Sequence, residues 1–152
     1  MTDPNLGRIL IDEGSILYFK VMNIVSLQDN RDYYILEDPN GLKHFIDAEA
    51  YATYGIKIGS KLKCKVDKIN CTGRILLEPE HPIYVDGQTY FFKVISVNES
   101  GVNNNIVVED IFQNRIEVNI QNIKNQLGKD VESLKAVVIK VKKGRPILEF
   151  VD

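Results

Sequence analysis

The chain has 152 residues, of which 44% are hydrophobic and 26% charged, and its formal net charge is −2. This composition is typical of a soluble globular protein. No apolar run reaches the roughly 20 residues that span a bilayer, and residues 1–8 lack the basic-then-apolar layout of a secretory signal. Without an export signal, Cys64 and Cys71 indicate a reducing compartment and free thiols. We therefore expect a soluble cytoplasmic protein.

An internal repeat divides the sequence into two similar halves. Residues 18–21 (YFKV) return as residues 91–94 (FFKV), an offset of 73 (91 minus 18). Residues 35–38 (ILED) return as 107–110 (VVED), an offset of 72 (107 minus 35). Blocks that recur in the same order at a nearly constant offset indicate two copies of one module of about 72 residues. The repeat predicts module one at residues 1–79 and module two at residues 80–152.

Module one is predicted to contain five strands and one short helix. The strands are rich in β-branched and aromatic residues, and they are expected at residues 15–25, 33–37, 42–46, 61–69 and 74–78. The Asp-Pro-Asn-Gly sequence at residues 38–41 predicts the turn of a hairpin. Asp47 is suited to cap a short helix at residues 48–54, which Gly55 would end.

Module two follows the same plan. Its strands are expected at residues 89–97, 106–109, 115–118, 133–141 and 146–150, with a short helix at residues 120–127. Three strands, a short helix and two further strands are the order of the OB-fold. The predicted fold class is therefore all-β with short helices, in two tandem five-stranded Greek-key barrels of the OB type.

Two segments of module one resemble a known family. Residues 42–49 (LKHFIDAE) are similar to the third strand and helix start of the OB-fold repeats of ribosomal protein S-one. Residues 58–69 (IGSKLKCKVDKI), followed by Gly73-Arg74-Ile75, resemble their fourth and fifth strands. RNA binding is what the resemblance implies. Those repeats usually carry an exposed histidine before the helix, whereas this chain has Phe45 in module one and Glu117 in module two.

Strand alternation sorts the side chains into a core face and an exposed face. Phe19 and Val21 should face the core, which places Tyr18 and Lys20 on the other side. In OB-folds the outer barrel face holds ligands, where aromatic rings stack on bases and basic side chains follow the phosphates. The candidate nucleic-acid-binding residues are Tyr18, Lys20, Tyr33, Lys43, Phe45, Lys63 and Arg74 in module one and Phe91, Lys93 and Arg115 in module two. The alternative is that these rings pack between the barrels or under loops.

Charge and catalytic groups bear on the class of function. Residues 57–74 carry six basic residues against one acid, and residues 135–145 carry five against none. These basic strands support nucleic-acid binding, although they also fit a solvated strand face. His44, His81, Cys64 and Cys71 lack the paired close spacing of a zinc site. The carboxylates Glu37-Asp38 and Glu109-Asp110 recur at matching strand ends, which favours a role in turns. We expect no catalytic residues, no metal and no cofactor.

The leading hypothesis is a non-enzymatic protein that binds RNA or single-stranded nucleic acid on module one. The alternative is a protein-protein interaction or scaffold module, which the acidic pI of about 5.7 supports. Either could be part of a larger multi-module polypeptide. Residues 7–12 (GRILID) also match residues 73–78 (GRILLE) of the fifth strand. They are expected to be ordered, and to form an extra strand segment beside an exposed edge of module one.

Overall fold

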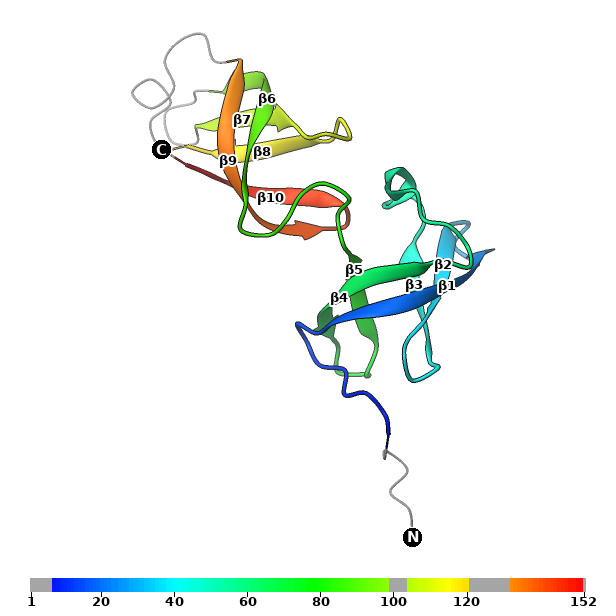
Figure 1. The fold of residues 1–152 in the computed structure, drawn as a ribbon. Helices are drawn as coiled ribbons and strands as arrows, with labels where there is room; N and C mark the ends of the chain where they lie inside the picture. The colour runs from blue at the N-terminus through cyan, green and yellow to red at the C-terminus, as the bar shows by residue number, and fades with distance from the viewer. Residues whose placement is uncertain (1–6, 99–103, 121–131, 152) are drawn as a thin grey trace. The chain divides into compact units, whose positions relative to one another are not determined.

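The chain divides into two compact units, Met1–Pro82 and Ile83–Asp152. The structure, a computed structural model, describes residues 7–98, 104–120 and 132–151. Figure 1 shows the strands of the first unit from blue to green and those of the second from green to red. In both units the strands alternate between buried and exposed residues, as expected of curved sheets with one face on a core.

The first unit is a five-stranded antiparallel sheet with the strand order β3-β2-β1-β4-β5. Its strands are β1 (Ile16–Ser26), β2 (Asp32–Glu37), β3 (Lys43–Asp47), β4 (Lys61–Ile69) and β5 (Ile75–Pro79). The long strand β1 pairs with β4 over its first half and with β2 over its second half. A long first strand that serves two halves of a curved sheet is the arrangement of the five-stranded Greek-key barrel.

β-bulges at matching places bend the sheets of both units. In the first unit the register shifts between Val21 and Asn23 in β1 and between Val66 and Lys68 in β4. In the second unit the register of strand β6 (Thr89–Asn98) shifts between Val94 and Ser96. An extra residue in one strand of a pair bends that strand and increases its twist. The bulges therefore let one central strand pair with both of its neighbours around a barrel.

Inward-facing residues of all the strands form the core of the first unit. Phe19 in β1 and Leu36 in β2 are fully buried, as are Cys64 and Val66 in β4. Tyr51, which follows β3, packs on the same core and donates a hydrogen bond from its hydroxyl to Glu78 Oε1 at 3.1 Å. Burying one large apolar side chain contributes about 1.5–3 kcal/mol, so this cluster is the main source of stability of the unit.

The second unit repeats the strand order as β10-β9-β6-β7-β8. Its strands besides β6 are β7 (Asn105–Glu109), β8 (Arg115–Asn119), β9 (Ser133–Lys142) and β10 (Arg145–Phe150). The two outer strands, β8 and β10, lie next to each other, and the Arg145 guanidinium donates a hydrogen bond to the carbonyl of Arg115. This barrel is nearly closed, whereas β3 and β5 of the first unit approach each other over a shorter stretch. Phe92 occupies in β6 the buried place that Phe19 has in β1.

The fold class predicted from the sequence is confirmed: the protein is all-β, with two five-stranded antiparallel barrels of the OB type. The predicted helix at residues 48–54 is reduced to a turn and one short 3-10 helix, η1 (Ala52–Tyr54). Asp47 Oδ1 accepts hydrogen bonds from the amides of Glu49 and Ala50 and so stabilises the turn that precedes η1, but η1 itself has no side-chain cap. So short a segment has too few hydrogen bonds to offset the cost of starting an α-helix, and Gly55 ends it in the left-handed conformation. Residues 121–127 of the second predicted helix lie outside the described residues.

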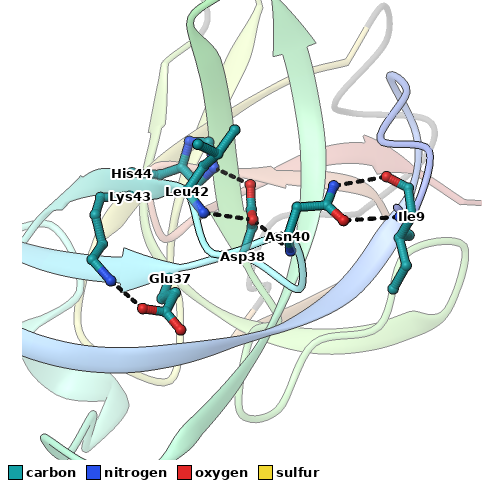
Figure 2. A network of polar contacts seen from close by, with 7 residues as sticks. All are labelled: Ile9, Glu37, Asp38, Asn40, Leu42, Lys43 and His44. Carbon is teal, nitrogen blue, oxygen red and sulfur yellow. Dashed lines mark hydrogen bonds and ion pairs between the residues drawn. The ribbon is translucent and has the colours of Figure 1, made fainter. Parts of the chain in front are cut away.

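The N-terminal residues 8–12 form no strand, so the extra strand segment expected there is not present. Side-chain contacts hold the segment instead. Ile11 packs against the core of the first unit, while Ile9 and Leu10 are 47% and 78% exposed. The backbone of Ile9 is bound by the side chain of Asn40, which lies in the β2–β3 turn (Figure 2).

Candidate functional site

The outer face of the first barrel carries most of the sequence-predicted residues. Tyr18 is 60% exposed and Phe45 is 43% exposed, and both lie on strands whose alternate residues are buried. Lys20 and Lys43 are exposed on the same strands. The face therefore presents rings and cations to solvent, as the strand alternation predicts.

Strand register places one charged row straight across this face. Lys20 of β1 pairs with Glu37 of β2, Glu37 pairs with Lys43 of β3, and Lys20 pairs on its other side with Lys61 of β4. Directly paired residues have side chains on the same face of the sheet. Lys43 forms an ion pair with Glu37, shown in Figure 2, so one of the three lysines in this row is already neutralised.

Two lysines of the charged row, Lys20 and Lys61, and three residues on one side of it form a group that we call the Tyr18 cluster: Tyr18, Lys20, Lys61, Lys63 and Lys65. Tyr18 pairs with Lys63 across the β1–β4 ladder, and its neighbours in that ladder are Lys61 and Lys65. Diagonal neighbours across two strands lie about 7–8 Å apart, within reach of long side chains. Lysines of β4 thus lie along one side of an exposed phenol ring, and Lys20 lies next to the ring on the same face of β1. Lys61 and Lys65 were missed by the sequence analysis, because alternation within β4 does not reveal that β4 pairs with the part of β1 that holds Tyr18.

On the other side of the row lies the Phe45 cluster: Phe45, Tyr33, Asp29, Arg31 and Asp47. The rings of Tyr33 and Phe45 meet edge to face with their centroids 6.4 Å apart. The Tyr33 hydroxyl donates a hydrogen bond to Asp29 Oδ2 at 2.5 Å, which raises the pKa of Tyr33 and lowers the pKa of Asp29. Arg31 forms an ion pair with Asp47. The polar groups of this cluster therefore bind one another, and Phe45 is its main exposed apolar surface.

The two clusters are too far apart to act on neighbouring bases. Tyr18 and Phe45 lie on strands separated by β2, and on opposite sides of the row that contains Lys20. Strands are about 4.8 Å apart and rise about 3.3 Å per residue, so the two Cα atoms are separated by about 16 Å. Tyr18, Lys20 and Lys63 come together, and Tyr33 and Phe45 come together, but the structure does not join them into one continuous site. Arg74 belongs to neither cluster, since it lies in the turn before β5.

The second unit has a less basic version of the same face. Phe91 is 74% exposed and pairs with Lys135, as Tyr18 pairs with Lys63. Lys93 and Arg115 both pair with Glu109, which lies between them. In β9, Ser133 and Val137 occupy the positions equivalent to Lys61 and Lys65. Ser133 pairs with Lys93, and Val137 pairs with Thr89. A shallow, open depression beside Phe91 is lined by residues 91–94, Glu132 and Ser133. Asn105 and Glu117 take the places of Tyr33 and Phe45.

The buried carboxylates serve turns, as expected. Asp38 is 3% exposed and accepts hydrogen bonds from the amides of Asn40 at 2.8 Å and Leu42 at 3.0 Å and from His44 Nε2 at 2.8 Å (Figure 2). Burial acts against the ionised form, but these hydrogen bonds, that of His44 foremost, outweigh it and hold the pKa of Asp38 below its ordinary value. Asp110 is 5% exposed and binds the corresponding β7–β8 turn through the amides of Phe112 and Asn114. Neither carboxylate faces solvent.

The cysteines and His81 lie apart from one another and from the two clusters. Cys64 lies in the core, where burial raises its pKa, and Cys71 is exposed in the β4–β5 turn. His81 is buried against the ring of Tyr54. Within the described parts of the chain, no three His, Cys, Asp or Glu side chains lie close enough together to hold a metal ion. The described residues also include no helix long and apolar enough to cross a membrane.

Comparisons with known proteins give a likeness in fold only. No family model matches the chain, and no curated protein matches it. Among solved structures, a tetrameric HIN2 crystal structure aligns over 91% of this chain and 89% of its own, with 8% identity and a TM-score of 0.31. A structure reported as "Structural mimicry for functional antagonism" aligns over 96% of this chain and 93% of its own, with 10% identity and a TM-score of 0.29. A third structure, reported as "Molecular basis for abrogation of activation of pro-inflammatory cytokines", aligns over 96% of this chain and 94% of its own, with 9% identity and a TM-score of 0.29.

Similarities this weak carry no argument about function. None of the three structures is described as a ribosomal protein. The resemblance to the repeats of ribosomal protein S-one therefore still depends on the residues quoted for it.

Proposed function

We propose that the chain is a non-enzymatic binding protein that holds RNA or another single-stranded nucleic acid on the outer face of its first barrel. The observation that carries this proposal is the Tyr18 cluster, an exposed ring with lysines around it on a solvent-facing sheet. Stacking of a base on an aromatic side chain contributes about 1–3 kcal/mol, and it tolerates any base because every base has a flat face. Lysines beside the ring are placed to contact the phosphates on either side of a stacked base.

Phe45 offers a second stacking surface on the same barrel. Its distance from Tyr18 suits bases that are several nucleotides apart along one strand. The ion pairs of Lys43 and Arg31 leave the surroundings of Phe45 close to neutral. We therefore assign the larger share of the binding free energy to Tyr18, Lys20 and Lys63, and the smaller share to Phe45, Tyr33 and Lys43.

We propose a non-enzymatic protein because of the positions of its carboxylates. General acid–base catalysis needs a titrating group within hydrogen-bond reach of a substrate. Asp38 and Asp110 are buried in turns, where each accepts two hydrogen bonds from backbone amides and one from a side chain, His44 and Asn114 respectively. Glu37 of the exposed face is paired with Lys43.

Protein interaction is the second candidate function, and the face of the second barrel favours it. Phe91 is the most exposed of the large aromatic residues on the two faces. It stands beside a row in which Glu109 lies between Lys93 and Arg115, with Glu117 on the same strand as Arg115. An exposed ring among charges of both signs suits a protein partner better than a polyanion.

The test is fluorescence anisotropy with labelled random single-stranded RNA over a salt series. Binding by phosphate contacts must weaken linearly on a log–log plot as salt rises. The Tyr18→Ala variant should weaken RNA binding by about 5- to 150-fold, which corresponds to the loss of 1–3 kcal/mol of stacking. Phe91→Ala is the matched control, since it removes the equivalent ring from the second unit, and it should have a smaller effect. Absence of RNA binding by the unmodified protein at low salt would leave protein interaction as the function.

A further inference from the structure

Three lysines of β4 form a positive surface on the outer face of the first barrel. Lys61, Lys63 and Lys65 alternate with Leu62 and the buried Cys64, so all three side chains lie on the outer face. Lys20 of β1 adds a fourth charge, because it pairs with Lys61. In the described part of the chain the ion pairs engage only one of these four, Lys63, whose Nζ lies 3.9 Å from Glu80.

The carboxylates that face this surface are at its margins. Glu37 is paired with Lys43, and Glu80 is 58% exposed in its side chain. Glu78 of β5 pairs with Lys65 in the ladder, but its Oε1 accepts a hydrogen bond from Tyr51. The centre of the surface, around Tyr18, is left with a clear excess of positive charge. In contrast, the β2–β3 half of the barrel face has each of its cations bound by a carboxylate of a neighbouring strand or turn, through Lys43–Glu37 and Arg31–Asp47.

We propose that Lys61 and Lys65 are phosphate-binding residues, and that the main contacts of a single-stranded nucleic acid with the first barrel lie over β1 and β4, with the contact at Phe45 on β3 secondary. The inference rests on the proposed function and names the path of the ligand within it. Tyr18 stacks on one base, Lys63 and Lys20 contact the phosphates beside that base, and Lys61 and Lys65 extend the contact along β4 in both directions. The second barrel, with Ser133 and Val137 at the equivalent positions, lacks this extension.

The second barrel supplies the substitutions that test this path. The double variant Lys61→Ser, Lys65→Val gives β4 the residues that β9 carries at these positions. Both lysines are solvent-exposed, so the fold should persist, and circular dichroism melting checks that it does. The double variant Lys61→Arg, Lys65→Arg keeps the charges. The variant Lys140→Gln, Lys142→Gln removes the same net charge from exposed positions of β9 and is the control for a non-specific charge effect.

The measurement is the slope of log Kobs against log salt for random single-stranded RNA. Each lost phosphate contact reduces the slope for single strands by about 0.7, so the Ser/Val variant should reduce it by about 1.4. The Arg variant and the Lys140/Lys142 control should keep the slope of the unmodified protein. An unchanged slope in the Ser/Val variant, or an equal change in the control, would overturn the β1–β4 path while RNA binding itself stands. Failure of the proposed function would give a different result, because the unmodified protein itself would then not bind RNA.

Discussion

The side-chain amide of Asn40 forms two hydrogen bonds with the backbone of Ile9, 31 residues earlier in the chain. The amide of Ile9 donates to Asn40 Oδ1 at 2.8 Å, and Asn40 Nδ2 donates to the carbonyl of Ile9 at 2.8 Å (Figure 2). A carboxamide offers a donor and an acceptor side by side, which matches the N–H and C=O of one extended residue. The turn at residues 38–41 thereby fixes the N-terminal segment to the barrel.

We predict that Asn40→Ala releases Ile9 without unfolding the barrel. Exposed hydrogen bonds contribute little net stability, toward the lower end of about 0.5–1.5 kcal/mol each. The melting temperature should therefore change slightly, while the amide of Ile9 should exchange with solvent much faster in hydrogen-exchange NMR. Asn40→Asp keeps the acceptor but loses the donor, so in this variant the amide of Ile9 should exchange at an intermediate rate. Equal exchange rates of the Ile9 amide in the unmodified protein and both variants would show that the two Asn40–Ile9 hydrogen bonds do not form in solution.

Ile11 should matter more for stability than its neighbour Leu10. Ile11 packs against the core of the first unit, whereas Leu10 is 78% exposed. Truncation of a partly buried isoleucine removes part of the roughly 1.5–3 kcal/mol that full burial provides. We expect Ile11→Ala to lower the free energy of unfolding by about 1 kcal/mol or more, and Leu10→Ala to leave it almost unchanged, in urea denaturation. A larger loss from Leu10→Ala would mean that the segment packs in a different register.

The equivalent phenylalanines of the two cores should be equally costly to remove. Phe19 is 0% exposed and Phe92 is 2% exposed, and truncation of a buried phenylalanine to alanine costs about 3–5 kcal/mol. Chemical denaturation of Phe19→Ala and Phe92→Ala should show losses of this size. Tyr18→Ala, next to Phe19 but 60% exposed, is the matched surface control. A tolerated change at either phenylalanine would contradict the burial seen in that unit.

The order of the predicted strands was sufficient to predict the fold class, and strand alternation was sufficient to predict the direction of most side chains. It placed Phe19 and Val21 inward and Tyr18 and Lys20 outward, because alternation is a property of each strand by itself. Asp38 was likewise recognisable as a turn residue from its Asp-Pro-Asn-Gly context.

The sequence pattern could not predict which residues of neighbouring strands pair with each other. The pairing of Tyr18 with Lys63 joins residues that are 45 positions apart (63 minus 18), and bulges change the register within the β1–β2 and β4–β5 ladders. A shift of one residue would send the opposite set of side chains outward. For the same reason the sequence could not show that Tyr18 and Phe45 fall on opposite sides of the Lys20 row.

Asp38 should make the first barrel sensitive to acid. The pKa of Asp38 is lowered in the folded protein from an ordinary value of 3.8, whereas the unfolded chain should keep that ordinary value. Its contribution to stability is therefore fully present above about pH 4 and is lost as the pH falls through the folded pKa, because the unfolded state binds the proton more readily. The melting temperature of the unmodified protein should fall with pH in this window, and that of Asp38→Asn should fall less.

His44→Ala tests the cause of this pH dependence. A carboxylate only accepts hydrogen bonds, so His44 Nε2 must be the donor to Asp38 Oδ2. Without this donor, burial should raise the pKa of Asp38, which NMR titration of its carboxyl carbon measures directly. A titration curve that does not move would assign the low pKa to the backbone amides of the turn alone.

Lys20 and Lys43 occupy the same charged row, but they should differ in their effect on RNA binding. Lys43 is bound to Glu37, so a phosphate that contacts Lys43 must first break or share that ion pair. Lys20 pairs in the ladder with the same Glu37 but forms no ion pair among the described residues, and it lies beside Tyr18. Exposed ion pairs contribute only about 0–1 kcal/mol, so neither substitution should unfold the barrel. Lys20→Gln should weaken RNA binding and reduce the salt slope by about 0.7, whereas Lys43→Gln should change both much less. The reverse order, measured by anisotropy with the same RNA, would move the binding face from β1–β4 to β2–β3.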